Sequence, residues 1–446
     1  MNAPMEAVSK ADVERVFELQ STRQWSIRKS SIDERIERLK KLRDALKQNE
    51  EAVKNALYAD LRKADASAQG ELDACYTDID DAIANLADWM APVNVETSAA
   101  FADGKAKMVY EARGIVLLFG PWNFPFTLVF QPLVPIIAAG NCALVKPNEM
   151  APHVSAITTK IIRDTFPEDE IAAFEGGIEL ANDLLTLPVD HIFFTGSPAV
   201  GKVVMAAAAK HLASVTLELG GKNPVIVGPD ANVQDAAGKV AFLRNMNSGQ
   251  VCLCPENIYV PEDMAAEFIA TAQGTFQAMF YQDGELNTEA SGKIIDKRNL
   301  ERIRGYLDDA REKGATIVCG GEVIEESLSV HPTILTNVPA DARIMGEETF
   351  GPILSIFTYK DVEEVYESLH KQPKPLALYV FSESEEFVEE VLANTTSGGV
   401  TVNHCIMHVA EHHLPFGGVN NSGMGSYHGI HGFKELSHER AVLYTA

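Results

Sequence analysis

No apolar run in this sequence is long enough to cross a lipid bilayer. The longest run, FTLVFQPLVPIIAAG at residues 126–140, is shorter than the roughly 20 residues that a transmembrane helix needs. It also contains Gln131 and two prolines. We therefore expect no membrane partner.

Positive charge is also scarce. The chain has 38 lysines and arginines against 63 aspartates and glutamates, which gives a formal net charge of -25. A surface of this sign repels nucleic acids and anionic membranes at long range, so neither is predicted as a partner. The phosphate groups of a small cofactor can still bind at a local site.

Cysteines are few, and their spacing does not form a disulfide framework. The first ten residues, MNAPMEAVSK, lack the apolar core and the small-residue cleavage site of a signal peptide. We therefore expect a cytoplasmic protein with free thiols, among which Cys142 and Cys319 lie in apolar runs and are predicted to be inert core residues. The six cysteines are Cys75, Cys142, Cys252, Cys254, Cys319 and Cys405.

The apolar residues that are present predict an α/β fold. The first hundred residues have a helical period, with one stripe made by Ile32, Ile36, Leu39, Leu42 and Leu46. Short apolar runs then alternate with helix-length segments, first at 114–120, 141–147, 171–177, 191–196 and 215–221, and again at 224–228, 257–260, 315–321, 353–359 and 376–381. Such runs are typical of parallel strands covered on both faces. Because 446 residues exceed one ordinary core, we predict two doubly wound α/β domains in tandem.

The segment 93–112 has a different pattern. Its residues alternate in character around Asp103-Gly104, which predicts a β-hairpin. A two-stranded arm is only marginally stable alone, so we expect it to pair with another element or with a second subunit.

The stretch HIFFTGSPAVGK, residues 191–202, nearly matches the phosphate loop of nucleotide hydrolases. A strand enters a glycine turn at Gly196, and a predicted helix opens at Gly201-Lys202. Val203 stands where the loop needs Ser or Thr to hold magnesium. The remaining strand, turn and helix N-terminus suit an anion, so the pattern favours a dinucleotide pyrophosphate over a triphosphate.

Two possible metal motifs are weaker. HVAEH at 408–412 matches the inverted zinc-protease signature, but Pro415 and Gly417-Gly418 follow at once and would end the helix that it requires. Cys252-x-Cys254 has no second ligand pair at zinc spacing. We predict no metal site and a loop with exposed histidines.

A reactive thiol is predicted in NSGQVCLCPEN, residues 247–257. Cys252 lies in a Gly- and Ser-containing turn before a strand, where a thiolate is accessible. Glu218, in LELGGKNP, stands at a strand end, where side chains of α/β sheets meet ligands. A dinucleotide site, a thiol and a carboxylate together favour oxidation through a covalent thioester.

The ordered motif set resembles that of the aldehyde dehydrogenase superfamily. The motifs are GPWNFP (120–125), KPNE (146–149), FTGSPAVGK (194–202), LELGGK (217–222), GQVC (249–252), EETFGP (347–352) and LPFGG (414–418). The tail LPFGGVNNSGMGSYHGIHGF is similar to that of the class 3 branch, which includes fatty, benzaldehyde and coniferyl-aldehyde dehydrogenases.

The resemblance implies catalytic roles for three residues. Cys252 would attack the aldehyde carbon, and the Asn123 amide and the Cys252 backbone N–H would stabilise the oxyanion. Glu218 would activate the water that hydrolyses the thioester. The implied reaction is NAD(P)-dependent oxidation of a hydrophobic aldehyde, aromatic or of medium to long chain, to the carboxylic acid.

The resemblance also implies the cofactor residues. Lys146 and Glu149 would hold the adenosine ribose, and Glu348 would hold the nicotinamide ribose beside Phe350. Because a carboxylate at Glu149 would repel a 2′-phosphate, NAD is favoured, with NADP as the alternative. The residues placed near the nicotinamide and phosphates are Thr195, Gly196 and Ser197.

The family pattern divides the chain into three parts. Residues 1–93 and 113–217 would form a Rossmann-like NAD-binding domain, and residues 218–436 the catalytic domain. Residues 94–112 and 437–446 would form an oligomerisation arm of a homodimer. Two alternative functions remain open: a non-catalytic NAD-binding relative and a P-loop nucleotide hydrolase.

The chain departs from the family pattern at three positions. Cys254 stands where Ala is commoner, and its thiol could trap an oxidised Cys252 as a disulfide. Asn148 replaces the usual Ser of the lysine motif, which would alter cofactor preference slightly. Asn420 replaces a Gly of the tail loop, where asparagine tolerates the left-handed conformation.

Overall fold

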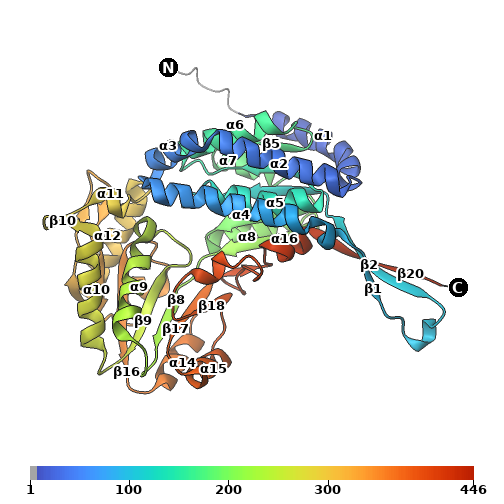
Figure 1. Ribbon diagram of the computed structural model, residues 1–446. Coiled ribbons are helices and arrows are strands. Elements are labelled where there is room, and N and C mark those ends of the chain that lie inside the picture. Colours follow the sequence, from blue (N-terminus) through green and yellow to red (C-terminus); the bar gives the residue numbers. More distant parts are fainter. Residues whose placement is uncertain (1–7, 446) are drawn as a thin grey trace.

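The computed structural model describes residues 8–445. Most of the ten residues in which no signal peptide is predicted lie outside this range. The described chain forms two lobes, each built on one large sheet, and an arm that projects from the first lobe (Figure 1). Both large sheets are mainly parallel, so the predicted fold class is confirmed.

The first sheet has six strands in the order β19-β7-β6-β3-β4-β5. Five are parallel, and β19 pairs antiparallel with β7 at one edge. Strand order reverses between β3 and β6, and ligands of such sheets bind at the carboxyl ends of the strands beside this reversal. The strands are β3 (Ile115–Phe119), β4 (Cys142–Lys146), β5 (Ile171–Ala173), β6 (His191–Gly196), β7 (Ser214–Leu219) and β19 (Gly423–Met424).

Helices cover both faces of this sheet, because alternate residues of each strand are buried on opposite sides. Val116 and Leu118 of β3 pack with the first group of helices, and Ile115 and Leu117 pack with the second. The first group is α2 (Ile32–Gln48), α3 (Glu50–Leu61), α4 (Asp65–Met90), α5 (Thr127–Ala139), α6 (Pro152–Thr165) and α16 (Gly429–Glu435). The second group is α1 (Lys10–Arg28), α7 (Ile178–Leu184) and α8 (Pro198–Ala208). In α2, the predicted stripe is the buried face.

The second sheet has seven strands in the order β12-β15-β16-β9-β8-β17-β18. All neighbours are parallel except β12, which is an antiparallel edge strand. The strands are β8 (Asn223–Val227), β9 (Pro255–Pro261), β12 (Thr316–Cys319), β15 (Thr333–Thr336), β16 (Ile353–Tyr359), β17 (Ala377–Phe381) and β18 (Gly399–Val402).

This sheet is also covered on both faces. Helices α9 (Val233–Asn245) and α10 (Ala265–Phe280) pack on one face. On the other face lie α12 (Lys297–Glu312), α13 (Arg343–Gly346), α14 (Val362–His370) and α15 (Glu385–Asn394). Smaller elements complete the lobe: β10 (Tyr281–Gln282) pairs with β11 (Glu285–Leu286), β13 (Val323–Ile324) pairs with β14 (Ser329–Val330), and α11 is Thr288–Ser291.

The arm is a three-stranded antiparallel sheet in the order β1-β2-β20. Its strands are β1 (Val93–Val95), β2 (Lys105–Ala112) and β20 (Ser437–Tyr444), and the connection from β1 to β2 includes the 3-10 helix η1 (Ala99–Phe101). The predicted turn is present, since the Gly104 N–H donates to the Phe101 carbonyl at 2.8 Å. The hairpin's partner within the chain is β20, which pairs with β2 along its whole length.

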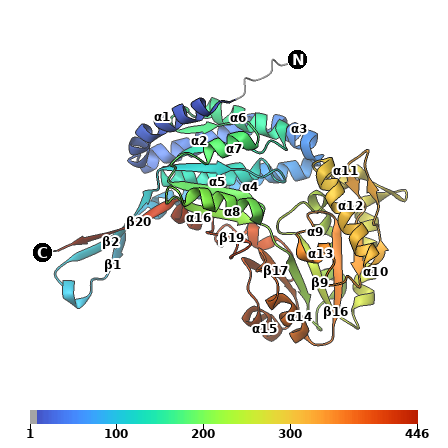
Figure 2. The ribbon, with the colours of Figure 1, turned by 180° about the vertical axis from the view of Figure 1, so that it is seen from behind.

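The C-terminal part of the chain leaves the second sheet and returns to the first lobe. Strand β19 extends the first sheet beside β7, and α16 packs against α4 and α5 (Figure 2). Gly423 and Met424 therefore lie beside the strand that carries Glu218.

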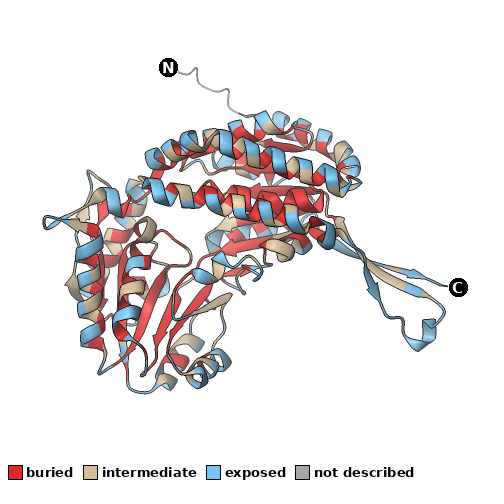
Figure 3. Cartoon of the chain, in the orientation of Figure 1, coloured by how far each residue is buried: buried red, intermediate tan, exposed pale blue. Residues whose placement is uncertain are grey.

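Burial follows this architecture. The central strands of both sheets are buried, whereas the arm is exposed or half-buried (Figure 3). Cys142 is buried as predicted, but the prediction for Cys319 is wrong, because β12 is a sheet edge and leaves this thiol partly exposed. Among residues 8–445, no helix combines the length and the apolar character that crossing a membrane requires.

Candidate active site

Cys252 lies in a tight loop between the 3-10 helix η2 (Met246–Gly249) and β9. Three successive residues before it, Asn247, Ser248 and Gly249, have φ values of 51°, 55° and 73°. Glycine adopts this left-handed region freely and asparagine tolerates it, whereas a serine is strained there. The loop is therefore held in a specific shape, and Cys252 is partly exposed while its neighbours Val251 and Leu253 are buried.

Gln250 holds this loop together. Its side-chain amide donates to the Asn247 and Lys293 carbonyls, both at 2.9 Å, and its side-chain oxygen accepts from the Ile295 N–H at 2.9 Å. Gln250 is fully buried. Gln250 is part of the motif GQVC, two residues before Cys252, but the motif alone predicts no function for its side chain.

Asn123 is tied to the same loop. It lies between β3 and α5 and is buried, and its Nδ2 donates to the Gln250 carbonyl at 3.0 Å. In return, Asn247 Nδ2 donates to the Asn123 carbonyl at 3.0 Å. Since an amide nitrogen carries two hydrogens, Nδ2 has a further donor for a ligand.

Glu218 is the penultimate residue of β7 and is 4% exposed. Within the described chain, neither of its carboxyl oxygens has a hydrogen-bond partner. Burial, and after it the charge of Glu435, raises the pKa of Glu218 well above its usual range. A buried carboxyl group without partners is costly to keep, so this group is a strong candidate for function.

Acidic side chains surround Cys252. Burial raises the pKa of the Cys252 thiol, and the charges of Glu348 and Glu218 raise it further. Burial also raises the pKa of the Tyr427 hydroxyl, and the charges of Glu218 and Cys252 raise it further. The thiol is thus protonated at neutral pH, and a nearby base or a bound positive charge is needed to activate it.

The predicted cofactor residues lie at the carboxyl ends of β4 and β6. Lys146 is buried at the end of β4, and its Nζ pairs with Glu149 Oε2 at 2.7 Å. Asn148 joins this loop to β3, since its Nδ2 donates to the Gly120 carbonyl at 3.2 Å. Thr195 of β6 lies directly opposite Glu218 of β7 in the register of the sheet.

The helix that follows β6 begins earlier than predicted. Ser197 is the N-cap of α8 and accepts from the Val200 N–H at 3.4 Å, and Pro198 is the first helical residue. The predicted start at Gly201-Lys202 is wrong, because a Ser-Pro pair is itself a helix N-terminal signal. Lys202 is consequently an exposed residue of the helix.

These residues fit a nicotinamide dinucleotide. Thr195 Oγ1 is buried and, among the described residues, has no hydrogen-bond partner. Gly196 packs against the Phe194 ring so closely that a Cβ would lie 2.6 Å from it. An unpaired hydroxyl and the exposed N-terminus of α8 provide a donor and an anion site at the strand ends.

Glu348 and Phe350 approach the same edge from the second lobe. The Glu348 carboxylate lies against Gly220, where a Cβ would be 2.0 Å from its Oε2. Burial and then the charge of Glu256 raise the pKa of Glu348 to about 8. Phe350 has a φ of 47°, and its ring packs edge-on against Trp122 with the centroids 5.3 Å apart.

Arg302 holds the Glu348–Phe350 segment in this strained shape. Its Nη1 donates to the Glu348 and Thr349 carbonyls at 3.3 and 2.8 Å, and its Nη2 donates to the Phe350 carbonyl at 3.4 Å. Arg302 was not among the predicted site residues, because it acts on backbone atoms and matches no motif.

The two weaker motifs do not assemble a metal site. The stretch 408–412 forms a 3-10 helix, η3 (Met407–Ala410), followed by a loop, so His408 and His412 do not share an α-helix face. His408 bonds to Thr401, and His412 lies 2.7 Å from Asp78. Both are partly buried, so the predicted exposure of these histidines is wrong for them and holds for His413.

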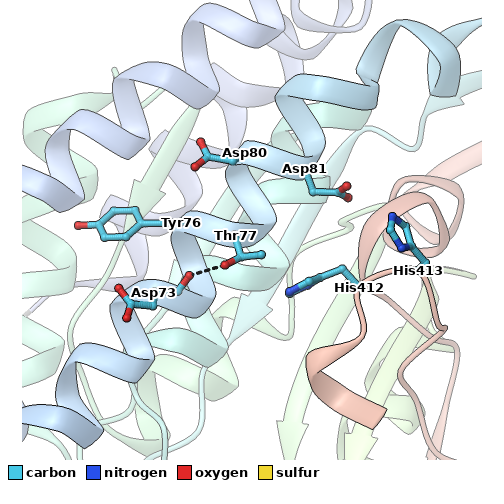
Figure 4. Close-up of a pocket in the computed structure, with 7 residues that line it drawn as sticks. All are labelled: Asp73, Tyr76, Thr77, Asp80, Asp81, His412 and His413. Atoms are coloured by element: carbon cyan, nitrogen blue, oxygen red, sulfur yellow. Dashed lines mark hydrogen bonds between the residues drawn. The ribbon is translucent and has the colours of Figure 1, made fainter. Parts of the chain in front are cut away.

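A polar surface pocket lies between α4 and the loop that carries His412 and His413 (Figure 4). Its carboxylates are largely engaged, since Asp80 pairs with Arg43 at 2.7 Å. Within residues 8–445, no group of three or more His, Cys, Asp or Glu could hold a metal ion. The pocket is lined by Asp73, Tyr76, Thr77, Asp80, Asp81, His412 and His413.

The fold and the site define an oxidoreductase with a thiol nucleophile, and comparison with known proteins identifies the family. A model of the aldehyde dehydrogenase family matches residues 2–442. The chain belongs to this family and is an aldehyde dehydrogenase that uses NAD or NADP.

Individual relatives are similar along nearly the whole chain. The 4,4′-diaponeurosporen-aldehyde dehydrogenase of Staphylococcus aureus is 39% identical over 98% of this chain and 93% of its own length. A dimeric NADP-preferring aldehyde dehydrogenase of Canis lupus familiaris is 38% identical over 92% of this chain and 89% of its own. An Arabidopsis thaliana member of aldehyde dehydrogenase family 3 is 38% identical over 92% of this chain and 85% of its own. The predicted resemblance to the class 3 branch is confirmed.

The fold is equally similar to solved structures. The substrate-bound state of AldH from Staphylococcus aureus matches with a TM-score of 0.93 and 37% identity. The match covers 100% of this chain and 95% of that one.

Proposed function

We propose that this enzyme oxidises a hydrophobic aldehyde, aromatic or of medium to long chain, to its carboxylic acid through a thioester on Cys252. The observation that carries the mechanism is the buried Glu218 carboxyl group, which has no partner within the described chain. It shares one electrostatic environment with the partly exposed Cys252. Asn123 is tied to the same loop through Gln250.

In the first half of the reaction, Cys252 Sγ bonds to the carbonyl carbon. The developing oxyanion accepts hydrogen bonds from Asn123 Nδ2 and from the Cys252 backbone N–H, which are fixed before the charge appears. NAD or NADP, when bound, supplies the hydride acceptor. Lys146, Glu149, Thr195, Gly196, Ser197, Glu348 and Phe350 would hold it.

In the second half, Glu218 removes a proton from the water that attacks the thioester. The carbon–sulfur bond breaks, the acid leaves, and the Cys252 thiol is restored. A general base works best when its pKa is near the working pH, and the raised pKa of Glu218 suits this role.

A hydrophobic substrate is supported by the aromatic cluster that adjoins the site. The Tyr427 ring packs edge-on against Phe193 and Phe416, with centroids 5.2 and 5.7 Å apart, and against His428 at 4.5 Å. The aldehydes in the names of relatives also favour this class.

The experiment that tests the mechanism follows NADH absorbance over a panel of aromatic and aliphatic aldehydes. The native enzyme should turn over, and Cys252→Ala should be inactive. Turnover by Cys252→Ala would exclude the thioester route, and no turnover by the native enzyme with any aldehyde would favour a non-catalytic NAD-binding relative.

NAD is the proposed cofactor, on the basis of Glu149. Its carboxylate pairs with Lys146 Nζ at 2.7 Å, and a carboxylate beside the ribose would accept from the 2′-hydroxyl and repel a 2′-phosphate. Glu149→Gln should therefore raise the ratio of kcat/KM for NADP to that for NAD by about tenfold. An unchanged ratio would remove Glu149 from this role, and Glu179→Gln, which changes an exposed carboxylate on α7, is the matched control.

Residues 94–112 and 437–446 are proposed to join two copies of the chain in a homodimer. The arm exposes several apolar side chains, and β1 and β20 are the edges of its sheet. The exposed residues are Val93, Val95, Phe101, Leu443 and Tyr444. Light scattering should give twice the chain mass, and a monomer would exclude the dimer.

Two further assignments belong to the proposal. The proposed NAD-binding domain comprises residues 1–93 and 113–217, and the proposed catalytic domain comprises residues 218–436, of which the end of β7, β19 and α16 lie in the first lobe. The proposed compartment is the cytoplasm, where a reducing environment keeps the six free cysteines reduced.

Cys254 is proposed to trap oxidised Cys252. Peroxide converts the Cys252 thiol to a sulfenic acid, and the Cys254 thiol then displaces water to form a disulfide. The Cys254 Sγ is buried and lies 3.4 Å from the Leu243 carbonyl, so this contact must break first. Thiol reductant should restore activity after peroxide in the native enzyme and not in Cys254→Ala, and equal recovery would exclude the trap.

A further inference from the structure

The motifs do not explain the state of Glu218. A general base must hold its proton with an affinity suited to the working pH, and burial alone is one way to raise that affinity. A second carboxylate is another, because two like charges disfavour each other. The structure contains such a carboxylate on α16, far away in the sequence.

Glu435 reaches the strand of Glu218 through Thr216. Thr216 precedes Glu218 by two residues in β7, so both side chains lie on the same face of the sheet. The fully buried Thr216 hydroxyl donates to Glu435 Oε1 at 2.7 Å.

The neighbouring strand leaves room for this contact. Gly423 of β19 lies opposite Glu218, and Gly425 follows two residues later. A Cβ on Gly425 would be 2.6 Å from Glu435 Oε1 and 3.2 Å from Thr216 Oγ1. The φ of Gly425 is +81°, so glycine is required there by its backbone as well.

His191, which is fully buried on β6, extends this network. Burial lowers its pKa to about 3, so the ring is neutral and carries one N–H. Its Nε2 lies 3.0 Å from Thr216 Oγ1, and its Nδ1 lies 2.7 Å from Ser214 Oγ.

Arg113 joins the two ends of this network, Ser214 and Glu435. Its Nη1 donates to Ser214 Oγ at 3.0 Å, and its Nε donates to the Glu435 backbone carbonyl at 2.6 Å. Glu435 is thus held at its side chain by Thr216 and at its backbone carbonyl by Arg113.

Glu435 and Glu218 differ in access to solvent. Glu435 is half-buried, whereas Glu218 is 4% exposed. A carboxylate near a buried carboxyl group disfavours the loss of its proton. Cys252 and Tyr427 also lie near Glu218, and both are neutral when protonated.

We infer that Glu435 is a positioning residue of the reaction: its carboxylate, which contacts Thr216 on the face of β7 that carries Glu218, sets the pH at which Glu218 loses its proton and becomes the base. The inference rests on the proposed role of Glu218. It assigns a function to α16 and explains why the chain returns to the first sheet after completing the second.

The test is the pH dependence of thioester hydrolysis, measured as the steady rate of NADH formation after the first turnover. Glu435→Gln keeps the acceptor for Thr216 and removes the charge. Its acidic limb should move to lower pH by about one unit, which is about a tenfold faster rate on the acidic side. Glu439→Gln, an exposed change on β20, should leave the limb where it is in the native enzyme.

A second measurement does not depend on activity. The infrared band of protonated carboxyl groups should lose intensity in Glu218→Gln, which assigns the Glu218 signal. The pH at which that signal disappears should be lower in Glu435→Gln than in the native protein.

The outcomes separate the inference from the proposed function. If Glu218→Gln stops the reaction after one turnover but Glu435→Gln keeps the native pH limb and the native infrared titration, the inference is wrong and the function stands. If Glu218→Gln turns over steadily at the native rate, the role of Glu218 is wrong and the inference fails with it.

Discussion

Two buried glutamates at the meeting of the lobes have opposite surroundings. Glu218 ends a strand of the first sheet and Glu256 begins a strand of the second, and they are 4% and 2% exposed. Glu218 has no hydrogen-bond partner among the described residues. Glu256 accepts from Lys222 Nζ and from the Thr349 N–H, both at 2.6 Å, and lies 4.0 Å from Arg244.

The difference has a clear electrostatic result. Burial would raise the pKa of both groups, but the charges of Lys222 and Arg244 and the hydrogen bonds to Glu256 outweigh it and lower the pKa of Glu256. The pKa of Glu218 stays raised. Depth of burial therefore does not distinguish the proposed base from a structural carboxylate, whereas the set of partners does.

Substitution by glutamine should lower turnover at Glu218 and stability at Glu256. The largest effect is expected for Glu218→Gln, which should lower steady-state turnover by about 10² to 10⁴-fold, because a general base is lost. At or below about pH 4.5 its free energy of unfolding should change by less than about 1 kcal/mol, since an amide and a protonated carboxyl group are both neutral. Stopped-flow NADH absorbance and urea denaturation measure the two effects.

Glu256→Gln should instead cost stability. Without the carboxylate, Lys222 and Arg244 keep buried charges that are no longer balanced, and the expected loss is about 3 kcal/mol in the free energy of unfolding. Urea denaturation at neutral pH measures it. A loss below that of Glu218→Gln would show that the partners of Glu256 do not stabilise the fold.

The two variants should also diverge with pH. A lowered folded-state pKa gives stability above the unfolded value that is lost as pH falls, so the advantage of the native protein over Glu256→Gln should shrink in acid. A raised folded-state pKa costs stability as pH rises. The free energy of unfolding of Glu218→Gln should therefore increase relative to that of the native protein as pH rises above about 4.5. The slope should reach up to about 1.4 kcal/mol per pH unit. Equal slopes for the two variants would contradict the assignment.

The smallest effect concerns two threonines. Thr349 Oγ1 donates to Glu256, whereas Thr195 Oγ1 has no partner in the described chain. Thr349→Val should lower the free energy of unfolding by about 1 to 2 kcal/mol, and Thr195→Val should leave it nearly unchanged. Thermal unfolding of both variants and of the native protein measures these changes. Equal losses of stability would mean that the two hydroxyl groups have similar environments.

The comparison also shows what sequence reasoning could find. Apolar runs predicted the central strands, since residues such as Val116 and Leu117 of β3 are buried on alternate faces. Cys252, Glu218 and Asn123 follow from motifs, and their roles remain predictions. Strands β15 and β18 were not predicted, because each contains only two apolar residues.

Residues that act through backbone atoms or across long separations stayed hidden. Gln250 bonds to carbonyl groups that no motif specifies, and Arg302 holds a strained segment by its carbonyls alone. Glu435 lies in a short helix with no recognisable signal, and only the pairing of β19 with β7 brings it to Thr216. Such contacts depend on the three-dimensional path of the chain.

The return of the chain to its first sheet also sets the order in which the enzyme can be built. On the ribosome, β7 emerges with one edge unpaired, and β19 follows only after the entire second sheet has been synthesised. During that interval the nascent chain presents an open strand edge to its neighbours, the kind of surface that chaperones cover and that aggregation exploits. Because the open edge belongs to the strand of Glu218, the chain acquires a complete catalytic edge only near the end of its synthesis.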